Sequence, residues 1–397
     1  MATIEASNGA SGSFVATYHD TADRRLTRAN IVLRRRMENG VGLWEAEVAG
    51  RRLRAPGGPV GVPDDIAKAL VAPLRGAGIV EVARLRTDER VAMLEGAHVL
   101  RTYEDERAAL HDTLDRSRGP KRRDPAPAHV GAFLAAQLAA IERNDPIVRV
   151  DPDVEALHDL RVAVRRTRTV LRATRSLFNG DWVDGLRDEL KWLAGELGPA
   201  RDLDVLITHL RPEREEVGPE ATPIIKRLER DRRGARRRAL AALDSDRYLA
   251  LLDELHVAVE HPPVQSTDRS LARVAAREFA KLRRDVAALG PQPTDEALHR
   301  VRIRGKRARY AAELAEQVVG KRARRMVKAA KRFQDVIGEH QDAIVAEQRI
   351  RAFAASADAA FGAGRLVERQ RARRARARGA VPAAWKRLER RGRRAWA

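Results

Sequence analysis

The chain contains an internal repeat, and this repeat is the feature that most constrains its fold. The segment ALHDLRVAVRRTRTVLRA at residues 156–173 returns as ALHRVRIRGKRARYAAEL at 297–314. Counterparts lie 141 positions apart, as His299 and His158 do. A repeat of this length, followed by a second repeated segment, indicates a duplicated helical domain.

Each copy places cations on one face of a predicted helix, which we call the cation stripe. On a wheel of about 100° per residue, the spacing i, i+3, i+7, i+10, i+14 confines the stripe to an arc of about 80°. Six arginines and no acid lie between Leu160 and Phe178, and six Lys or Arg and no acid lie between Leu298 and Ala312. Like charges at this spacing repel, so the stripes predict a duplicated anion site; an ordinary solvated basic face is the alternative. The candidate binding residues are His158, Arg161, Arg165, Arg166, Arg168, Arg172, His299, Arg302, Arg304, Lys306, Arg307 and Arg309.

The second repeated segment adds candidates from neighbouring helices. KWLAGELGPARD at residues 191–202 is related to KRFQDVIGEHQD at 331–342. The glycines of these segments, Gly198 and Gly338, predict a helix break or a close helix crossing. The acids at their ends are expected to orient stripe arginines or to cap the next helix. The added binding candidates are Lys191, Arg201, Lys331 and Arg332; the acids are Asp202 and Asp342.

Net charge points to an anionic partner. The chain carries a formal charge of +21 and has a sequence pI near 11.1, and such a balance favours polyanions. It has no cysteine, which excludes disulfides and thiolate metal sites. No signal peptide or membrane span is visible in the sequence. We therefore expect a soluble, cytoplasmic protein without a metal or cofactor.

The pattern along the chain predicts an α+β segment followed by helices. Extended segments are expected at 14–18, 30–37, 43–48 and 80–94, with a loop at 55–63 and a helix at 64–78. Helices follow from residue 128, with breaks at 211–223, 261–268 and 290–293. The predicted domains are an α+β segment at 1–110, a basic proline-rich linker at 111–127 and a helical domain at 128–390, whose repeats span 128–260 and 269–390.

The repeated motifs resemble those of the CHAD family, the conserved histidine α-helical domain. HDLRVAVRRTR, LGPARDLDV, LHRVRIRGKRARY and IGEHQDA occur in order within residues 127–389. The resemblance implies two pseudo-symmetric four-helix bundles and a basic central surface that binds inorganic polyphosphate. It also makes polyphosphate granules a candidate location. The residues themselves indicate only an elongated polyanion.

The N-terminal part resembles a CYTH domain, the triphosphate tunnel fold. The similarity is carried by YHDT at 18–21, LRRR at 33–36, Trp44 and VARLR at 82–86, within residues 14–93. It implies that Arg34 and Arg36, which alternate onto one strand face, are vestigial triphosphate ligands. The family's opening Glu-x-Glu-x-Lys motif is missing, Glu47 replaces an expected lysine, and the closing strands have no counterpart. Metal-assisted hydrolysis needs such carboxylates, so we expect a truncated, non-catalytic barrel whose open edges favour dimerisation or a cover from the helical domain.

The sequence leaves three candidate functions. Polyphosphate binding, as a regulatory module or a granule scaffold, is the leading hypothesis, and a metal-dependent triphosphatase or polyphosphatase is an alternative. Non-specific nucleic-acid binding is the other, because residues 365–397 hold 13 Lys or Arg and two acids. Aromatic content of 4% offers few stacking platforms, and Tyr310 is the one aromatic in either stripe. The tail RQRARRARARG is expected to form a frayed basic helix.

Overall fold

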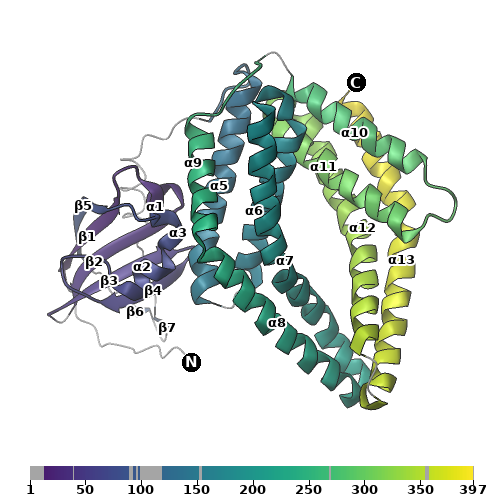
Figure 1. The fold of residues 1–397 in the computed structure, drawn as a ribbon, viewed down its shortest axis with the longest axis horizontal. Coiled ribbons are helices and arrows are strands. Elements are labelled where there is room, and N and C mark those ends of the chain that lie inside the picture. The colour runs from purple at the N-terminus through teal and green to yellow at the C-terminus, as the bar shows by residue number, and fades with distance from the viewer. Residues whose placement is uncertain are drawn as a thin grey trace. The chain divides into compact units, whose positions relative to one another are not determined.

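The chain divides into two compact units. A computed structural model describes residues 13–38, 40–88, 93–94, 97–98, 119–151, 154–267, 270–353 and 357–396. One unit comprises residues 1–118 with 139–156, and the other comprises 119–138 with 157–397. The first contains the sheet and the second is helical (Figure 1). The predicted domain boundary at 110 and the first part of the predicted linker, 111–118, lie outside the described residues.

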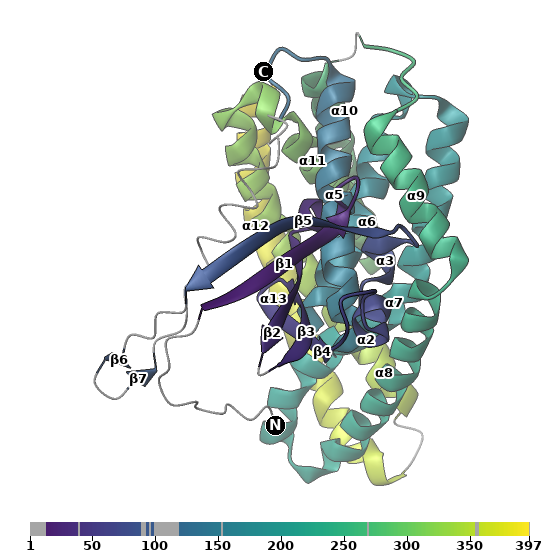
Figure 2. The same cartoon turned by 90° about the vertical axis from the view of Figure 1, so that its left-hand side faces the viewer.

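The first unit is built on a five-stranded antiparallel sheet with strand order β4-β3-β2-β1-β5. Figure 2 shows β1 beside β5. Its strands are β1 Ser13–Thr21, β2 Ile31–Glu38, β3 Val41–Val48, β4 Arg51–Pro56 and β5 Ile79–Asp88. The short helices are α1 Arg25–Arg28, α2 Asp64–Ala69 and α3 Val71–Leu74, and a two-residue pair, β6 Met93–Leu94 with β7 Ala97–His98, follows β5. Within the described residues β4 and β5 each pair with one neighbour, so the sheet is open at both sides.

The two faces of this sheet differ in chemistry. Leu33 pairs in register with Ala46, and both are buried on the apolar face. Arg34 pairs with Glu45 on the other face, and these side chains are 3% and 0% exposed. The strand alternation therefore puts Arg34 and Arg36 on one face, as the sequence predicts. Strand β4 was not predicted, because RRLRAP carries too few apolar residues to show alternation.

The YHDT motif has a structural role at the end of β1. Asp20 is 1% exposed, and its carboxylate accepts hydrogen bonds from the backbone amides of Leu26 at 2.9 Å and Thr27 at 3.0 Å. These bonds satisfy amides of α1 that would otherwise lack a partner. Residues 139–156 belong to the same unit, where Arg75 Nη1 lies 2.5 Å from Glu142 Oε1.

The helical unit repeats one order of helices. The first half contains α5 Ala126–Val150, α6 Val154–Ala173, α7 Gly180–Val217, α8 Thr222–Leu243 and α9 Asp246–Glu260, although residues 139–156 of α5 and α6 belong to the first unit. The second half contains α10 Leu271–Ala287, α11 Asp295–Val319, α12 Lys321–Phe353 and α13 Ala357–Ala395. The cation stripes lie on α6 and α11, and the second repeated segments lie on α7 and α12. The single helix α13 occupies the place in the order that α8 and α9 share in the first half, where Ser245 caps the start of α9.

All four helices of the second half share one core. Buried residues from α10, α11, α12 and α13 form a single hydrophobic cluster that includes Phe279, Leu298, Phe333 and Leu388, and α12 and α13 run side by side (Figures 1 and 2). The expectation of a frayed basic tail is therefore wrong. Ala377, Val381 and Leu388 recur at helical spacing and are buried, so packing fixes this segment despite its charge.

Helix α7 is longer than the sequence predicts. It continues through Pro199 and Pro212 to Val217, so the break predicted at 211–223 is reduced to a short 3-10 turn, η2 Pro219–Ala221. Each proline removes one backbone hydrogen bond, but Leu203 continues the packed face past Pro199, and Val217 is buried beyond Pro212. Gly198 and Gly338 also lie inside helices, so the helix break, one of the two alternatives predicted there, is wrong. No helix in the described part of the chain is long and apolar enough to cross a membrane.

Leu388→Ala is expected to destabilise the helical unit. Leu388 is fully buried, and truncating a buried leucine costs about 2–5 kcal/mol through lost burial and the cavity left behind. Urea unfolding followed by circular dichroism measures the change. Arg390→Ala, at an exposed position of α13, is the control. Equal unfolding midpoints for the two variants would contradict the placement of α13 in the core.

Candidate functional site

Helices α6 and α11 contact each other, and this contact brings the two cation stripes together. Arg165 Nε donates to the Tyr310 hydroxyl at 3.3 Å, and Arg166 Nη2 donates to Glu313 Oε2 at 2.8 Å. Tyr310 is fully buried, so its hydroxyl is a fixed acceptor. The duplicated stripes, predicted separately from the sequence, therefore face a common site.

Four half-buried cations lie at the centre of this site, and we call them the central cluster. They are Arg161 and Arg165 from α6 and Arg302 and Lys306 from α11. Arg161 Nη1 donates to the Gly198 carbonyl and to Asp202 Oδ1, both at 2.8 Å. Asp202 therefore orients a stripe arginine, which is one of the two predicted roles. It lies inside α7 and caps no helix.

Lys306 and Arg302 carry the least compensated charges of the cluster. Neither makes a hydrogen bond or ion pair with the described residues. Burial and the charges of Arg302 and Arg165 lower the pKa of Lys306 to about 7. Burial also lowers the pKa of Arg302, although Asp342 opposes the effect. Arginine remains protonated, so Arg302 holds a full charge in an unfavourable environment.

Asp342 is an acid whose charge acts on both Arg302 and Lys306. Burial raises its pKa despite the opposing fields of Arg302 and Arg373. Like Asp202, it lies inside a helix, α12, and caps no helix end. The central cluster is therefore only partly neutralised by the two acids that the sequence identified.

The two histidines begin the stripes in different hydrogen-bonding states. His158 Nδ1 accepts from Arg201 Nε at 3.0 Å, so the ring proton is on Nε2 in the neutral form. His299 Nδ1 lies 2.8 Å from Gln341 Oε1 and donates to it. In the neutral ring His299 Nε2 is then an acceptor. The repeat thus differs at this point because Arg201 aligns with Gln341.

Further along the stripes a second group of cations gathers. Burial, together with Arg187 and Arg165, lowers the pKa of Arg168. Burial, Arg172 and Arg304 lower the pKa of Arg307 to about 10. The stripe therefore continues from the central cluster through Arg168 toward Arg172 and Arg307 as a connected row of positive charge.

Three candidate residues are paired with acids from outside the stripes. Glu313 lies 2.8 Å from Arg166 and 3.2 Å from Arg309, and Asp285 on α10 lies 2.9 Å from Arg304. Tertiary packing brings the acids to Arg166 and Arg304, so the pattern of each stripe did not reveal these two pairs. Arg166 and Arg304 link α11 to α6 and to α10, whereas the pair of Arg309 with Glu313 lies within α11.

Lys191, Lys331 and Arg332 are exposed on α7 and α12. None of them makes a hydrogen bond or ion pair with the described residues. Lys191 precedes Gly198 by two helical turns on the same side of α7, and Gly198 is where Arg161 reaches that helix. Lys331 stands in the same relation to Gly338.

Arg373 on α13 is a residue of this region that the sequence reading missed. It is 8% exposed, and Glu339 Oε2 accepts from its Nη2 at 2.9 Å while His209 Nε2 lies 3.3 Å from the same nitrogen. Its charge also acts on Asp342. The apolar residues Ala377 and Val381, one helical turn apart on the same helix, are the sequence feature that indicates a packed segment.

In the N-terminal unit, Arg34 is engaged by an acid. Its Nε lies 3.1 Å from Glu45 Oε1, and Arg54 Nε lies 2.7 Å from Glu45 Oε2. Burial works to raise the pKa of Glu45, but the charges of Arg34 and Arg54 outweigh it and hold that pKa low. Arg36 on the same face is 4% exposed. Among the residues that the structure describes, no group of three or more His, Asp or Glu side chains is arranged to hold a metal ion.

The fold and the paired stripes define a helical domain with an internal repeat and a basic centre. A family model, that of the CHAD domain, matches residues 132–351. The match spans more than half of the chain, and the chain belongs to the CHAD domain family.

The solved structure of another CHAD domain supports this assignment. The crystal structure of the CHAD domain from the plant Ricinus communis is 26% identical, with a TM-score of 0.58, and covers 68% of this chain and 94% of that chain. PptA from Streptomyces chartreusis is 26% identical, with a TM-score of 0.55, and covers 66% of this chain and 100% of that chain. Two uncharacterized proteins of Mycobacterium tuberculosis, MT2285 of strain CDC 1551 and Rv2226 of strain H37Rv, are each 29% identical over 470 aligned residues, covering 94% of this chain and 89% of the relative.

Lys306→Met is expected to stabilise the ligand-free protein, because it removes a charge that its surroundings disfavour. The pKa of Lys306 falls from 10.5 to about 7 on folding. The charged side chain therefore destabilises the fold most below about pH 7, and the cost fades as pH rises toward the unfolded value. We expect a higher melting temperature, by about 2–4 °C per kcal/mol gained, with a larger gain near pH 6 than near pH 9. Lys331→Met, at an exposed position, is the control; equal shifts in both variants would refute the assignment.

Proposed function

We propose that this protein binds inorganic polyphosphate, a long polyanion, through the cation stripes of α6 and α11. The observation that carries the proposal is the central cluster, in which Arg302 and Lys306 are half-buried and lack acidic partners among the described residues. Holding like charges together in a partly desolvated site costs free energy. A bound polyanion offsets this cost, because it supplies the missing negative charge.

The spacing of the stripes suits an extended ligand with closely spaced charges. Stripe residues recur every three or four positions, which places them about 5–6 Å apart along a helix. Guanidinium groups bind phosphate oxygens bidentately, while Lys306 acts as a point charge. His158, whose Nδ1 accepts from Arg201, is proposed as a ligand contact at the start of the stripe. The connected row from Arg161 toward Arg307 supports an elongated ligand over a compact one.

Nucleic acid is supported less well by the same residues. Base stacking needs exposed aromatic rings, and Tyr310, the aromatic of the stripes, is fully buried. The arginines of α13 are also partly paired with acids, since Arg371 pairs with Glu347 and Arg369 pairs with Glu216.

A polyphosphate-binding protein of this kind is expected where long polyphosphate accumulates, in granules.

Removing the central cluster is expected to abolish polyphosphate binding while leaving the helices folded, because the α6–α11 bond between Arg166 and Glu313 is retained. The variant replaces four residues with alanine: Arg161, Arg165, Arg302 and Lys306. A matched control removes four exposed charges of α13: Arg376, Arg387, Arg390 and Arg394. We expect the affinity for long-chain polyphosphate to fall at least ~100-fold in the first variant, and its log–log salt slope to fall by about 3, since each lost contact contributes about 0.7.

Fluorescence competition between polyphosphate and duplex DNA, repeated at several salt concentrations, measures the affinity and its salt slope. The wild-type protein is expected to release DNA when polyphosphate is added. Preference for DNA, or loss of binding in the α13 control alone, would place the function in the basic tail. Circular dichroism of both variants checks that helicity is retained.

We also propose that the N-terminal unit is non-catalytic. The pairing of Arg34 and Arg54 with Glu45 supports this, because these charges satisfy one another. Incubation with tripolyphosphate and Mg²⁺ or Mn²⁺ is therefore expected to release no phosphate above a buffer blank. Phosphate release that disappears in Arg34→Ala, but persists in the exposed control Arg84→Ala, would instead support the triphosphatase alternative.

A further inference from the structure

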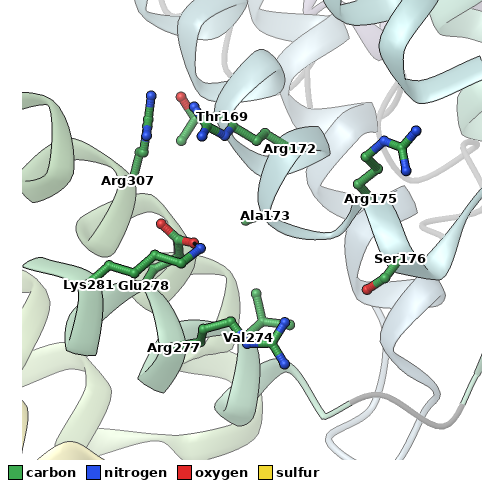
Figure 3. Close-up of a pocket in the computed structure, with 10 residues that line it drawn as sticks. All are labelled: Thr169, Arg172, Ala173, Arg175, Ser176, Val274, Arg277, Glu278, Lys281 and Arg307. Atoms are coloured by element: carbon green, nitrogen blue, oxygen red, sulfur yellow. Dashed lines mark hydrogen bonds and ion pairs between the residues drawn. The ribbon is translucent and has the colours of Figure 1, made fainter. Parts of the chain in front are cut away.

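A small cavity lies where the row of stripe cations meets α10. It has a volume of about 210 Å³ and is lined by side chains from α6, the 3-10 turn η1 Arg175–Leu177, α10 and α11 (Figure 3). At about 30 Å³ per water molecule, this space holds a small polyatomic ion with some of its hydration. The cationic lining residues are Arg172, Arg175, Arg277, Lys281 and Arg307.

These cations differ in how far they are already neutralised. Arg175 turns away from the others (Figure 3) and pairs with Asp184 at 2.8 Å. Lys281 lies 2.5 Å from Glu278, the one acid of the lining. Arg172, Arg277 and Arg307 make no hydrogen bond or ion pair with the residues that the structure describes. Three guanidinium groups from three helices therefore border the cavity without an acidic partner among the described residues.

We propose that this cavity binds a single dianionic phosphate group, as free phosphate or as the terminal phosphate of a polyphosphate chain. The second form rests on the proposed function. Arg277 and Lys281, which the sequence reading did not select, would then belong to an end-group site that is distinct from the central cluster.

Charge density distinguishes a chain end from a chain interior. Interior phosphates carry about one negative charge each, whereas a terminal phosphate with a second pKa near 6 carries close to two at neutral pH. The cavity lining holds five cations and one acid, which matches such a concentrated charge better than an extended row does. Each guanidinium group can donate two hydrogen bonds in a fixed fork, and the terminal phosphate presents more free oxygens than an interior one.

The position of the cavity also suits the end of a polyphosphate chain. Arg307 and Arg172 belong both to its lining and to the stripes, and Arg168 connects them electrostatically to Arg165 of the central cluster. On the α10 side, Lys281 pairs with Glu278, which is 8% exposed. A chain lying along the stripes would thus reach a pocket bounded by the α10 side chains.

Arg277→Ala tests the proposal against Arg273→Ala, an equal loss of charge on the same helix outside the lining. Both arginines are exposed, so neither variant is expected to unfold. Calorimetric titration uses three probes: linear tripolyphosphate, which has terminal phosphates; cyclic trimetaphosphate, which has none; and orthophosphate. We expect Arg277→Ala to lower tripolyphosphate affinity about tenfold or more, the loss typical of a charge-assisted contact, and to leave trimetaphosphate affinity within the change seen in Arg273→Ala.

The orthophosphate titration separates the two sources of the phosphate group. Orthophosphate binding that is lost in Arg277→Ala assigns the pocket to free phosphate as well as to chain ends, whereas loss confined to tripolyphosphate assigns it to chain ends. Equal effects of Arg277→Ala and Arg273→Ala on tripolyphosphate would overturn the proposal. If the wild-type protein bound tripolyphosphate in this way but failed to bind long chains, the pocket would stand and the proposed function would fail.

Discussion

The contact between α6 and α11 is the interaction on which the binding site depends. Tyr310 accepts a hydrogen bond from Arg165, and Glu313 accepts one from Arg166. These bonds hold the two copies of the basic motif together despite the repulsion between their positive charges. Without this contact each stripe would be an ordinary basic helix face, which water and salt would screen.

This arrangement sets binding against stability. Some cations are used as structural partners, as Arg166 is with Glu313 and Arg304 with Asp285. Others, above all Lys306 with its lowered pKa, remain uncompensated in a half-buried place. Proteins commonly tolerate such local cost where a ligand supplies the missing charge. The division between paired and unpaired cations therefore separates residues that build the site from residues that serve a ligand.

Much of the fold could be predicted because its signals are local or repeated. The repeat indicated the duplicated helical domain, and strand alternation placed Arg34 and Arg36 on one face. The errors occurred where packing outweighs local preference. Pro212 and Gly198 lie within helices because buried neighbours continue the core, and the arginine-rich tail is a packed helix because Val381 and Leu388 bury one face.

The sequence by itself determined that two similar helices carry unusually uniform positive charge, since spacing and composition are properties of the chain alone. Only the tertiary structure decided which of those charges remain available. Acids from elsewhere, such as Glu313 and Asp285, neutralise some stripe arginines, while Arg277 of α10, outside the predicted set, joins Arg172 and Arg307 around a cavity. The physical reason is that electrostatic compensation depends on distance in space, and residues far apart along the chain set it.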